Sequence, residues 1–418
     1  LGGTARLPST GRAPGPTVSS YTLAVSVSPS SGGTVTGTGI NCPGDCSELH
    51  APDASITLNA VANVGYIFTG WSGCDSANDT TCYVTMNSNR NITAAFTPFP
   101  AVELSWATTF GGEWGNGANA IQQTSDGGYI VAGYDAGSYD AVAMKLDENG
   151  NVQWRKTYGG AIEDEGKFVQ QTSDGGYILV GDTYSFGAGS YDVLAMKLDA
   201  NGDVQWQNAY GGSDGDVAGS ALQTADGGYI IAGWTYSFGS GAPSYDDLWI
   251  LKLATGGDVQ WQKTYGGAKY EGAHSIQKTL DGGYIVAGVT TSPTGSHDAW
   301  LLKLDADGNI QWQKTYGSSS GWDEATSVQQ TSDGGYIVAG ETESFGAGRF
   351  DAWLLKLDAN GNIQWQKSYG GSDDDDAASV QQTSDGGYIL VGDTYSFGAG
   401  GYDAWILKLD AAGNIQWQ

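Results

Sequence analysis

The chain has 418 residues, long enough for two or three domains, and it combines 66 Gly with 11% aromatic residues. This composition is typical of an all-β protein with many tight turns and excludes a disordered chain. The formal net charge of −28 argues against nucleic acid and anionic membranes as partners, and it favours cations or neutral ligands. No apolar stretch approaches the roughly 20 residues of a membrane helix, so we expect no membrane insertion.

Residues 1–20 are rich in Gly, Pro, Ser and Thr and have no apolar pattern that a fold could bury. We therefore expect an extended tail that is disordered on its own. The chain begins at Leu1 and not at Met, which we interpret as a mature form whose targeting segment has been removed. This interpretation predicts a secreted protein that is extracellular or located at the cell surface.

Residues 21–98 are expected to form a small β module. The segments Tyr21–Val27 and Ser55–Val61 alternate apolar and polar side chains, as half-buried strands do, and Asn91–Phe96 closes the module. All four Cys lie between positions 42 and 82. An even number of Cys in one small region predicts local disulfides and hence an oxidising, extracytoplasmic location.

Three motifs of this module resemble the internalin-type B-repeat modules of bacterial surface proteins: Gly39–Cys46, Phe68–Cys74 and Thr81–Met86. The resemblance covers nearly the whole module, and its Gly-Trp-Ser-Gly-Cys motif is fairly specific. It implies a spacer or stalk that is displayed at a cell surface.

The four Cys allow three connectivities, and their spacings favour Cys42–Cys46 and Cys74–Cys82. A zinc site is the competing interpretation, with His50 as the local His.

Residues 99–418 contain six copies of one repeat. Each copy carries an Asp-Gly-Gly-Tyr signature, and successive signatures lie 48 to 55 residues apart. The signatures begin at Asp126, Asp174, Asp226, Asp281, Asp333 and Asp385. Each copy has the pattern of four short strands separated by Gly-rich turns. The pattern predicts an all-β fold, in which a six-bladed β-propeller of four-stranded blades follows the small disulfide-bearing β module.

The repeats resemble the arrays of secreted bacterial and archaeal β-propeller proteins, and this resemblance covers about three quarters of the chain. It implies the fold, and it implies no particular activity, because one fold serves many functions.

A Trp recurs on the fourth strand of the repeats, and we interpret it as a wedge between successive blades. The recurring residues are Trp106, Trp154, Trp206, Trp261, Trp312, Trp365 and Trp417. Six blades require six fourth strands, so the seven Trp-bearing strands are one more than required. The first, Leu104–Phe110, either completes the last blade and closes the ring or leaves an open edge for another chain. The tail of residues 1–20 could fill such an edge on a neighbour, which predicts a homo-oligomer or filament.

Two turns recur with little variation, Thr-x-Asp-Gly-Gly and Asp-x-Asn-Gly-Asn, the second as at Asp305–Asn309. The second turn places oxygen ligands at alternate positions, as half a calcium loop does. The alternative is a hairpin in which Asp or Asn caps the turn and Gly supplies the positive φ. Calcium is therefore the cofactor that this turn leaves open.

One register of the repeat is expected to stand at a mouth of the central channel, just before the first strand of each blade. It holds Asn116, Asp164, Asp216, Glu271, Asp323 and Asp375. These groups are interpreted either as caps of local amides or as a ring that binds a cation or another ligand. The same face should carry the aromatic loops between the second and third strands, with Phe186, Phe238, Phe345 and Phe397.

No catalytic constellation stands out: the chain has three His and no Ser/His/Asp or His/Glu pattern. We therefore favour a non-catalytic extracellular structural or surface protein that assembles into a filament or surface layer. The first alternative is an adhesin-like propeller that binds glycans or cations. The second is a secreted carbohydrate-active enzyme that uses two carboxylates from different blades.

Overall fold

The structure is a computed structural model that describes residues 19–63, 66–78, 80–98, 109–110, 116–239, 245–291, 296–318, 320–398 and 400–418. The chain divides into two compact units, one of Leu1–Val102 with Gln416–Gln418 and one of Glu103–Ile415. All regular elements of the described residues are strands, and none of these residues belongs to a helix long and apolar enough to cross a membrane. Most of the predicted tail and of the strand Leu104–Phe110 lies outside the described residues.

The first unit is a sandwich of two sheets, with strand orders β4-β1-β9-β6 and β3-β2-β5-β8-β7. Strands β1 and β9 run parallel, and the other paired strands run antiparallel. In the described residues the strands are β1 (Tyr21–Ser28), β2 (Gly33–Gly37), β3 (Ile40–Cys42), β4 (Ser47–His50), β5 (Ser55–Ala62), β6 (Tyr66–Ser72), β7 (Ser76–Asn78), β8 (Thr81–Thr85) and β9 (Arg90–Pro98).

The core of this unit lies between its sheets and includes Leu23, Leu58 and Ile92, which are fully buried. The inward side chains alternate with exposed ones along β5, as the sequence pattern predicts. The unit contains the two disulfides Cys42–Cys46 and Cys74–Cys82, so no free thiol is left.

The second unit consists of six four-stranded antiparallel sheets, which we call blades 1 to 6. In the described residues blade 1 contains β10 (Asn116–Gln123), β11 (Tyr129–Asp135), β12 (Asp140–Leu146) and β13 (Val152–Tyr158). Blade 2 contains β14 (Asp164–Gln171), β15 (Tyr177–Thr183), β16 (Asp192–Leu198) and β17 (Val204–Tyr210). Blade 3 contains β18 (Asp216–Gln223), β19 (Tyr229–Thr235), β20 (Asp247–Leu253) and β21 (Val259–Tyr265).

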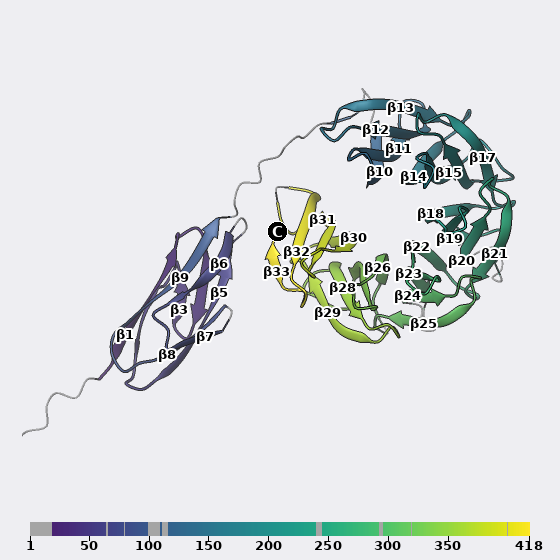
Figure 1. The fold of residues 1–418 in the computed structure, drawn as a ribbon. Helices are drawn as coiled ribbons and strands as arrows, with labels where there is room; N and C mark the ends of the chain where they lie inside the picture. Colours follow the sequence, from purple (N-terminus) through teal and green to yellow (C-terminus); the bar gives the residue numbers. More distant parts are fainter. Residues whose placement is uncertain are drawn as a thin grey trace, which may run out of the picture. The chain divides into compact units, whose positions relative to one another are not determined.

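The remaining three blades repeat the same order of strands. Blade 4 contains β22 (Glu271–Lys278), β23 (Tyr284–Thr291), β24 (His297–Leu304) and β25 (Ile310–Tyr316). Blade 5 contains β26 (Asp323–Gln330), β27 (Tyr336–Thr342), β28 (Asp351–Leu357) and β29 (Ile363–Tyr369). Blade 6 contains β30 (Asp375–Gln382), β31 (Tyr388–Thr394), β32 (Asp403–Leu409) and the short β33 (Ile415–Trp417). Figure 1 shows the first strands nearest the centre of the blade array and the fourth strands at its periphery.

The hydrophobic cores of this unit lie between blades and not within them. Five buried clusters each combine residues of two successive blades, from the junction of blades 1 and 2 to that of blades 5 and 6. Five of the seven recurring Trp act as the predicted wedge at these junctions. The ring of Trp312, for example, packs edge-on against Tyr336 of the next blade at a centroid distance of 5.8 Å. Trp417 is 40% exposed instead, and Trp106 lies outside the described residues.

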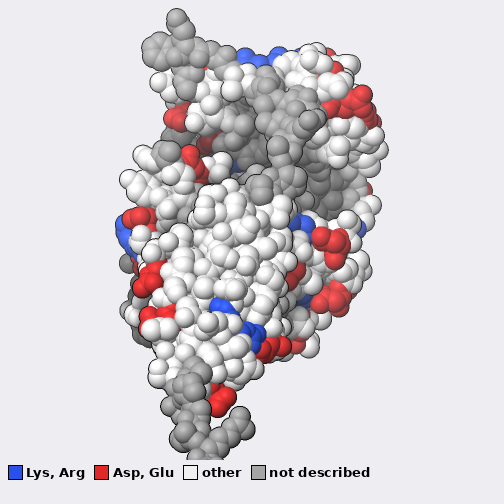
Figure 2. Space-filling model, turned by 90° about the vertical axis from the view of Figure 1, so that its left-hand side faces the viewer, with Lys and Arg blue, Asp and Glu red and all other residues white. Residues whose placement is uncertain are grey.

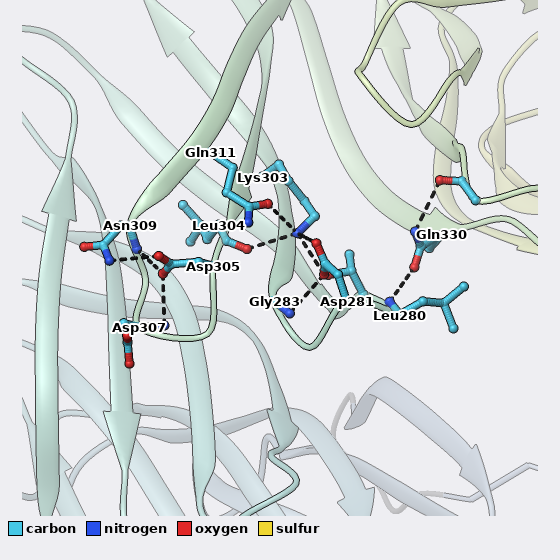
Figure 3. Close-up of polar contacts among 12 residues, drawn as sticks. Leu280, Asp281, Gly283, Lys303, Leu304, Asp305, Asp307, Asn309, Gln311 and Gln330 are labelled. Carbon is cyan, nitrogen blue, oxygen red and sulfur yellow. Dashed lines mark hydrogen bonds and ion pairs between the residues drawn. The ribbon is translucent and has the colours of Figure 1, made fainter.

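The Thr-x-Asp-Gly-Gly turn is held by a buried lysine from the third strand of the same blade. In blade 4 Lys303 is almost fully buried, and its Nζ lies 2.8 Å from Asp281 Oδ2. The ammonium also donates to the carbonyl of Leu304 and to Gln311, so all three of its protons are used (Figure 3). The same pair recurs in the other five blades.

The Asp-x-Asn-Gly-Asn turn is capped by its own leading carboxylate. Asp305 accepts hydrogen bonds from the backbone N–H groups of Asp307 and Asn309, and from the Asn309 side chain (Figure 3). Gly308 supplies the positive φ of 76°. The turn therefore has the geometry of the capped hairpin, and calcium binding at this turn stays a prediction.

Candidate functional site

Five of the predicted channel-mouth residues open the first strand of their blades with a buried carboxyl group: Asp164, Asp216, Glu271, Asp323 and Asp375. Asp323 illustrates the arrangement, because it accepts hydrogen bonds from the hydroxyls of Thr342 and Ser344 and from the N–H of Ser318. It thereby joins two loops at one end of the blade. Asn116 has a similar role and accepts a hydrogen bond from the N–H of Ala136.

This geometry supports the structural interpretation of that register and offers no open ring of carboxylates. The described residues also contain no group of three or more His, Cys, Asp or Glu side chains that could hold a metal ion. The predicted cation ring therefore has no support in the arrangement of these side chains.

The four predicted loop aromatics pack against their own blades. Phe345 lies 5.5 Å from the ring of buried Trp353, and Phe238 and Phe397 contact the equivalent Trp249 and Trp405. Phe186 packs on the core between blades 1 and 2. Phe238 is the one of the four that is exposed by more than a third, so these rings mainly anchor loops.

A β-bulge in the first strand of each blade sets a different group of side chains apart from the regular register. The register slips by one residue in all six first strands, as between Ala273 and Ser275 in blade 4. In blades 1, 4 and 5 the bulged residue reaches the first strand of the next blade, as His274 does in its ion pair with Glu324. The bulged residues are Asn119, Lys167, Gly219, His274, Thr326 and Ala378.

The bulged position and its neighbours depart from the repeat, whereas the structural positions recur in nearly every blade. The second residue of the first strand is Gly117, Glu165, Val217, Gly272, Glu324 or Asp376. Its cross-strand partner on the second strand is Tyr134, Asp182, Trp234, Val289, Glu341 or Asp393. Residues that stabilise the fold are needed in all six blades. The positions that vary between blades are therefore the candidates for ligand contacts.

A pocket of about 300 Å³ lies between blades 2 and 3 at these positions. Its aromatic wall consists of Trp234, Tyr184 and Tyr191, and the two Tyr rings meet edge-on at 5.3 Å. Its volume is at the lower end of the range for small-ligand pockets.

The polar wall of the pocket includes Glu163, Glu165 and the ion pair of Lys167 with Asp182. Burial raises the pKa of Asp182, and the ammonium of Lys167 opposes this effect. The same ammonium lies 5.9 Å from the centre of the Trp234 ring. The pocket thus combines apolar ring faces with fixed charged groups that can accept or donate hydrogen bonds.

A second group of one-off residues adjoins the pocket across blades 3 to 5. His274 lies 5.7 Å from the Trp234 ring on one side, and its Nε2 is 2.7 Å from Glu324 Oε1 on the other. Trp322 donates its indole N–H to Glu324, and His297 stacks on the Trp322 ring. Burial raises the pKa of Glu324, but the bonds from His274 and Trp322 outweigh it and leave the pKa below its ordinary value.

Two carboxyl groups from neighbouring blades, Glu341 and Asp376, share a hydrogen bond at the same end of the channel. Burial, reinforced by the bond to Asp376 and by its charge, raises the pKa of Glu341 well above its ordinary value. One proton is therefore held between the two groups over part of the neutral range.

We expect Glu341→Gln to make the protein more stable at pH 8 than the native chain. The folded Glu341 binds a proton that the unfolded chain releases near pH 4.5, so native stability falls as the pH rises from that value through the folded pKa. The amide keeps the hydrogen bond and removes this titration. Thermal unfolding at pH 5 and pH 8 measures the effect, with Glu343→Gln, on an exposed residue of the same loop, as the control. A gain that is equal at both pH values would contradict the assignment.

Figure 2 shows Asp and Glu side chains scattered over one face of the molecule between broad uncharged areas. On this face no single acidic patch stands out, although the net charge of the chain is −28.

Comparisons with known proteins identify the parts of the chain to different extents. The curated Regulatory protein FlaEY of Caulobacter vibrioides is 26% identical over 176 residues, which are 37% of this chain and only 18% of that protein. The WD40 domain of Pan2 from Neurospora crassa is similar in structure, with a TM-score of 0.47, 13% identity, and coverage of 71% of this chain and 76% of that one. A puromycin hydrolase gives a TM-score of 0.44 with 14% identity, over 88% of this chain and 52% of that one. Residues 23–100 match the family model of the divergent InlB B-repeat domain, so the first unit is a module similar to that domain.

Proposed function

We propose that the protein is a non-catalytic surface protein whose propeller recognises a carbohydrate at the pocket between blades 2 and 3. The observation that carries the proposal is the convergence of Trp234, Tyr184 and Tyr191 with acidic groups at positions that depart from the repeat. Sugar rings present apolar C–H faces that stack on aromatic rings and hydroxyls that donate to carboxylates. A neutral glycan also suits a chain whose net charge is −28.

The first unit supports a location outside the cytoplasm. Its two disulfides persist in oxidising compartments. Its similarity to the divergent InlB B-repeat domain fits a spacer that carries the propeller away from a surface. Assembly into a filament remains a prediction, because it depends largely on residues outside the described ranges.

A carbohydrate-active enzyme is less well supported by the geometry. Glycosidases hold their two carboxyl groups about 5 Å apart or more, so that a sugar or a water fits between them. The conspicuous carboxyl pair of this channel, Glu341 with Asp376, is in direct hydrogen-bond contact instead.

Glycan binding is tested by array screening of the full chain, followed by calorimetry with the best oligosaccharide. We expect Trp234→Ala to weaken binding at least tenfold, equivalent to about 1.4 kcal/mol, because it removes the stacking surface. Tyr184→Ala should weaken binding severalfold.

The matched control is Tyr395→Ala, because Tyr395 meets Tyr402 in blade 6 edge-on at 5.3 Å, as Tyr184 meets Tyr191 in blade 2. Trp234 lies on the blade that follows blade 2, whereas among the described residues no following blade packs on blade 6. The Tyr pair of blade 6 therefore lacks a counterpart of Trp234, and the control should bind normally. Equal loss in the two Tyr variants, or no retained glycan, would refute the proposal.

A further inference from the structure

The two ends of the blade array expose surfaces that are buried at every junction inside it. Ile121 of blade 1 is 63% exposed, whereas its equivalents in blades 2 to 6 are at most 3% exposed: Val169, Ala221, Ile276, Val328 and Val380. These equivalents all face the preceding blade. Blade 1 therefore presents an uncovered face to the position that a preceding blade would take.

Blade 6 shows the complementary exposure on its opposite face. Val391 is 41% and Ile406 is 45% exposed, although the equivalent residues of blades 1 to 5 are fully buried. Those residues are Ala132, Val180, Ala232, Ala287 and Ala339 on the second strand, and Ala143, Ala195, Ile250, Leu301 and Leu354 on the third. Among the described residues no buried cluster joins blade 6 to blade 1.

The blade 1 face is hollowed as well as apolar. A pocket of about 460 Å³ opens on it, and its lining includes Ile121, Val131, Val142 and Met144. Figure 1 shows blades 1 and 6 at the two ends of an arc, with the other four blades between them. Exposed apolar faces of this kind on a soluble fold mark interaction surfaces.

We propose that these two faces together bind one further four-stranded blade of the same repeat, which completes the ring. Five junctions inside the chain already show how such a face is covered, by the opposite face of a blade of this repeat. A single blade has both faces, so it can cover Ile121 with one and Val391 with the other.

A whole second copy of the chain does not fit this position. Its blade 1 could cover Val391, but the other face of that blade is already buried against its own blade 2. The apolar face of the first copy around Ile121 would remain exposed to solvent. The blades curve in one direction along the arc (Figure 1), so the blades of a second copy that continued this curve from blade 6 would turn toward the place of blade 1.

The test appends a second copy of residues 367–418 after Gln418, which extends the chain by one repeat in register. The native chain has no free thiol, so Ile121→Cys and Val391→Cys each introduce a unique site for maleimide labelling. We expect both thiols to react quickly in the unextended chain and at least tenfold more slowly in the extended one. Leu280→Cys, at an 85% exposed turn residue, should react equally in both.

The matched control places Val391→Asp and Ile406→Asp changes in the appended copy only. The new blade then still covers Val391→Cys, but its charged face no longer covers Ile121→Cys, which becomes reactive again. A second extended chain carries residues 314–366 after Gln418 instead of residues 367–418. It tests the same prediction if the first appended blade does not fold.

Two outcomes would overturn the proposal. One is labelling of Ile121→Cys at the unextended rate in both extended chains. The other is protection of this thiol in the unextended chain as its concentration is raised, because a second copy would then cover the face.

Discussion

Gly340→Ala is expected to destabilise the propeller by at least about 3 kcal/mol, at the upper end of overpacking costs. A Cβ at this position would lie 1.7 Å from the carbonyl oxygen of Glu324 on the neighbouring strand. The bulge that re-aims Thr326 brings this carbonyl close, so the strand cannot give way without losing the bulge. The same Gly and the same close approach recur in all six blades.

Denaturant unfolding measures the effect, with Gly256→Ala as the matched control. Gly256 is an exposed turn residue whose added Cβ would meet no atom within 4 Å, so the change should stay within about 0.5 kcal/mol. Equal losses of stability in Gly340→Ala and Gly256→Ala would show that the close approach at the bulge is not the reason why Gly recurs in the second strand of each blade.

Much of the fold could be predicted from the sequence because local signals carry it. The Asp-Gly-Gly-Tyr period sets the number and length of blades, and the alternation along each strand sets its faces. The four Cys are close enough in sequence for spacing to favour Cys42–Cys46 and Cys74–Cys82. The Trp wedge follows from its recurrence, since a large aromatic in every copy must serve the contact between copies.

The site was missed because its residues meet across blades. The contact of His274 with Glu324 spans 50 residues, and no spacing within one repeat predicts it. The ion pair of Lys303 with Asp281 cannot be predicted from spacing either, because the two residues lie on different elements of the blade. The repeated acids such as Asp323 allow the interpretation as a ring, but the carboxylate at this strand start, which is present in five of the six blades, anchors loops.

One signal in the sequence could have found the site. When the six copies are aligned on the Asp-Gly-Gly-Tyr signature, the bulged position holds Lys167 in blade 2 and His274 in blade 4. Trp234 replaces an acidic residue or a smaller side chain at its own position. In a repeat protein such departures mark residues that the scaffold does not require.

Asp281→Ala is expected to cost about 2 kcal/mol at neutral pH, because it leaves the ammonium of Lys303 buried without its carboxylate. This expected loss of stability is smaller than the loss for a fully buried ion pair, because the Asp281 side chain is half exposed and solvent screens its charge. Lys303→Met should cost less, since it removes the charge and keeps most of the volume. The double variant should therefore be more stable than Asp281→Ala alone.

The cost should also vanish in acid. Burial alone would raise the pKa of Asp281, but the bonds from Lys303 and Thr279 outweigh it and lower the pKa from 3.8 to about 2. A depressed carboxyl pKa contributes stability that is fully present above the unfolded value, and this stability is lost as the pH falls through the folded value. The difference between the native chain and Asp281→Ala should thus be constant above about pH 5 and shrink toward zero near pH 2. Urea unfolding across this range measures it, and a difference that persisted at pH 2 would show that the carboxylate acts through packing and not through its charge.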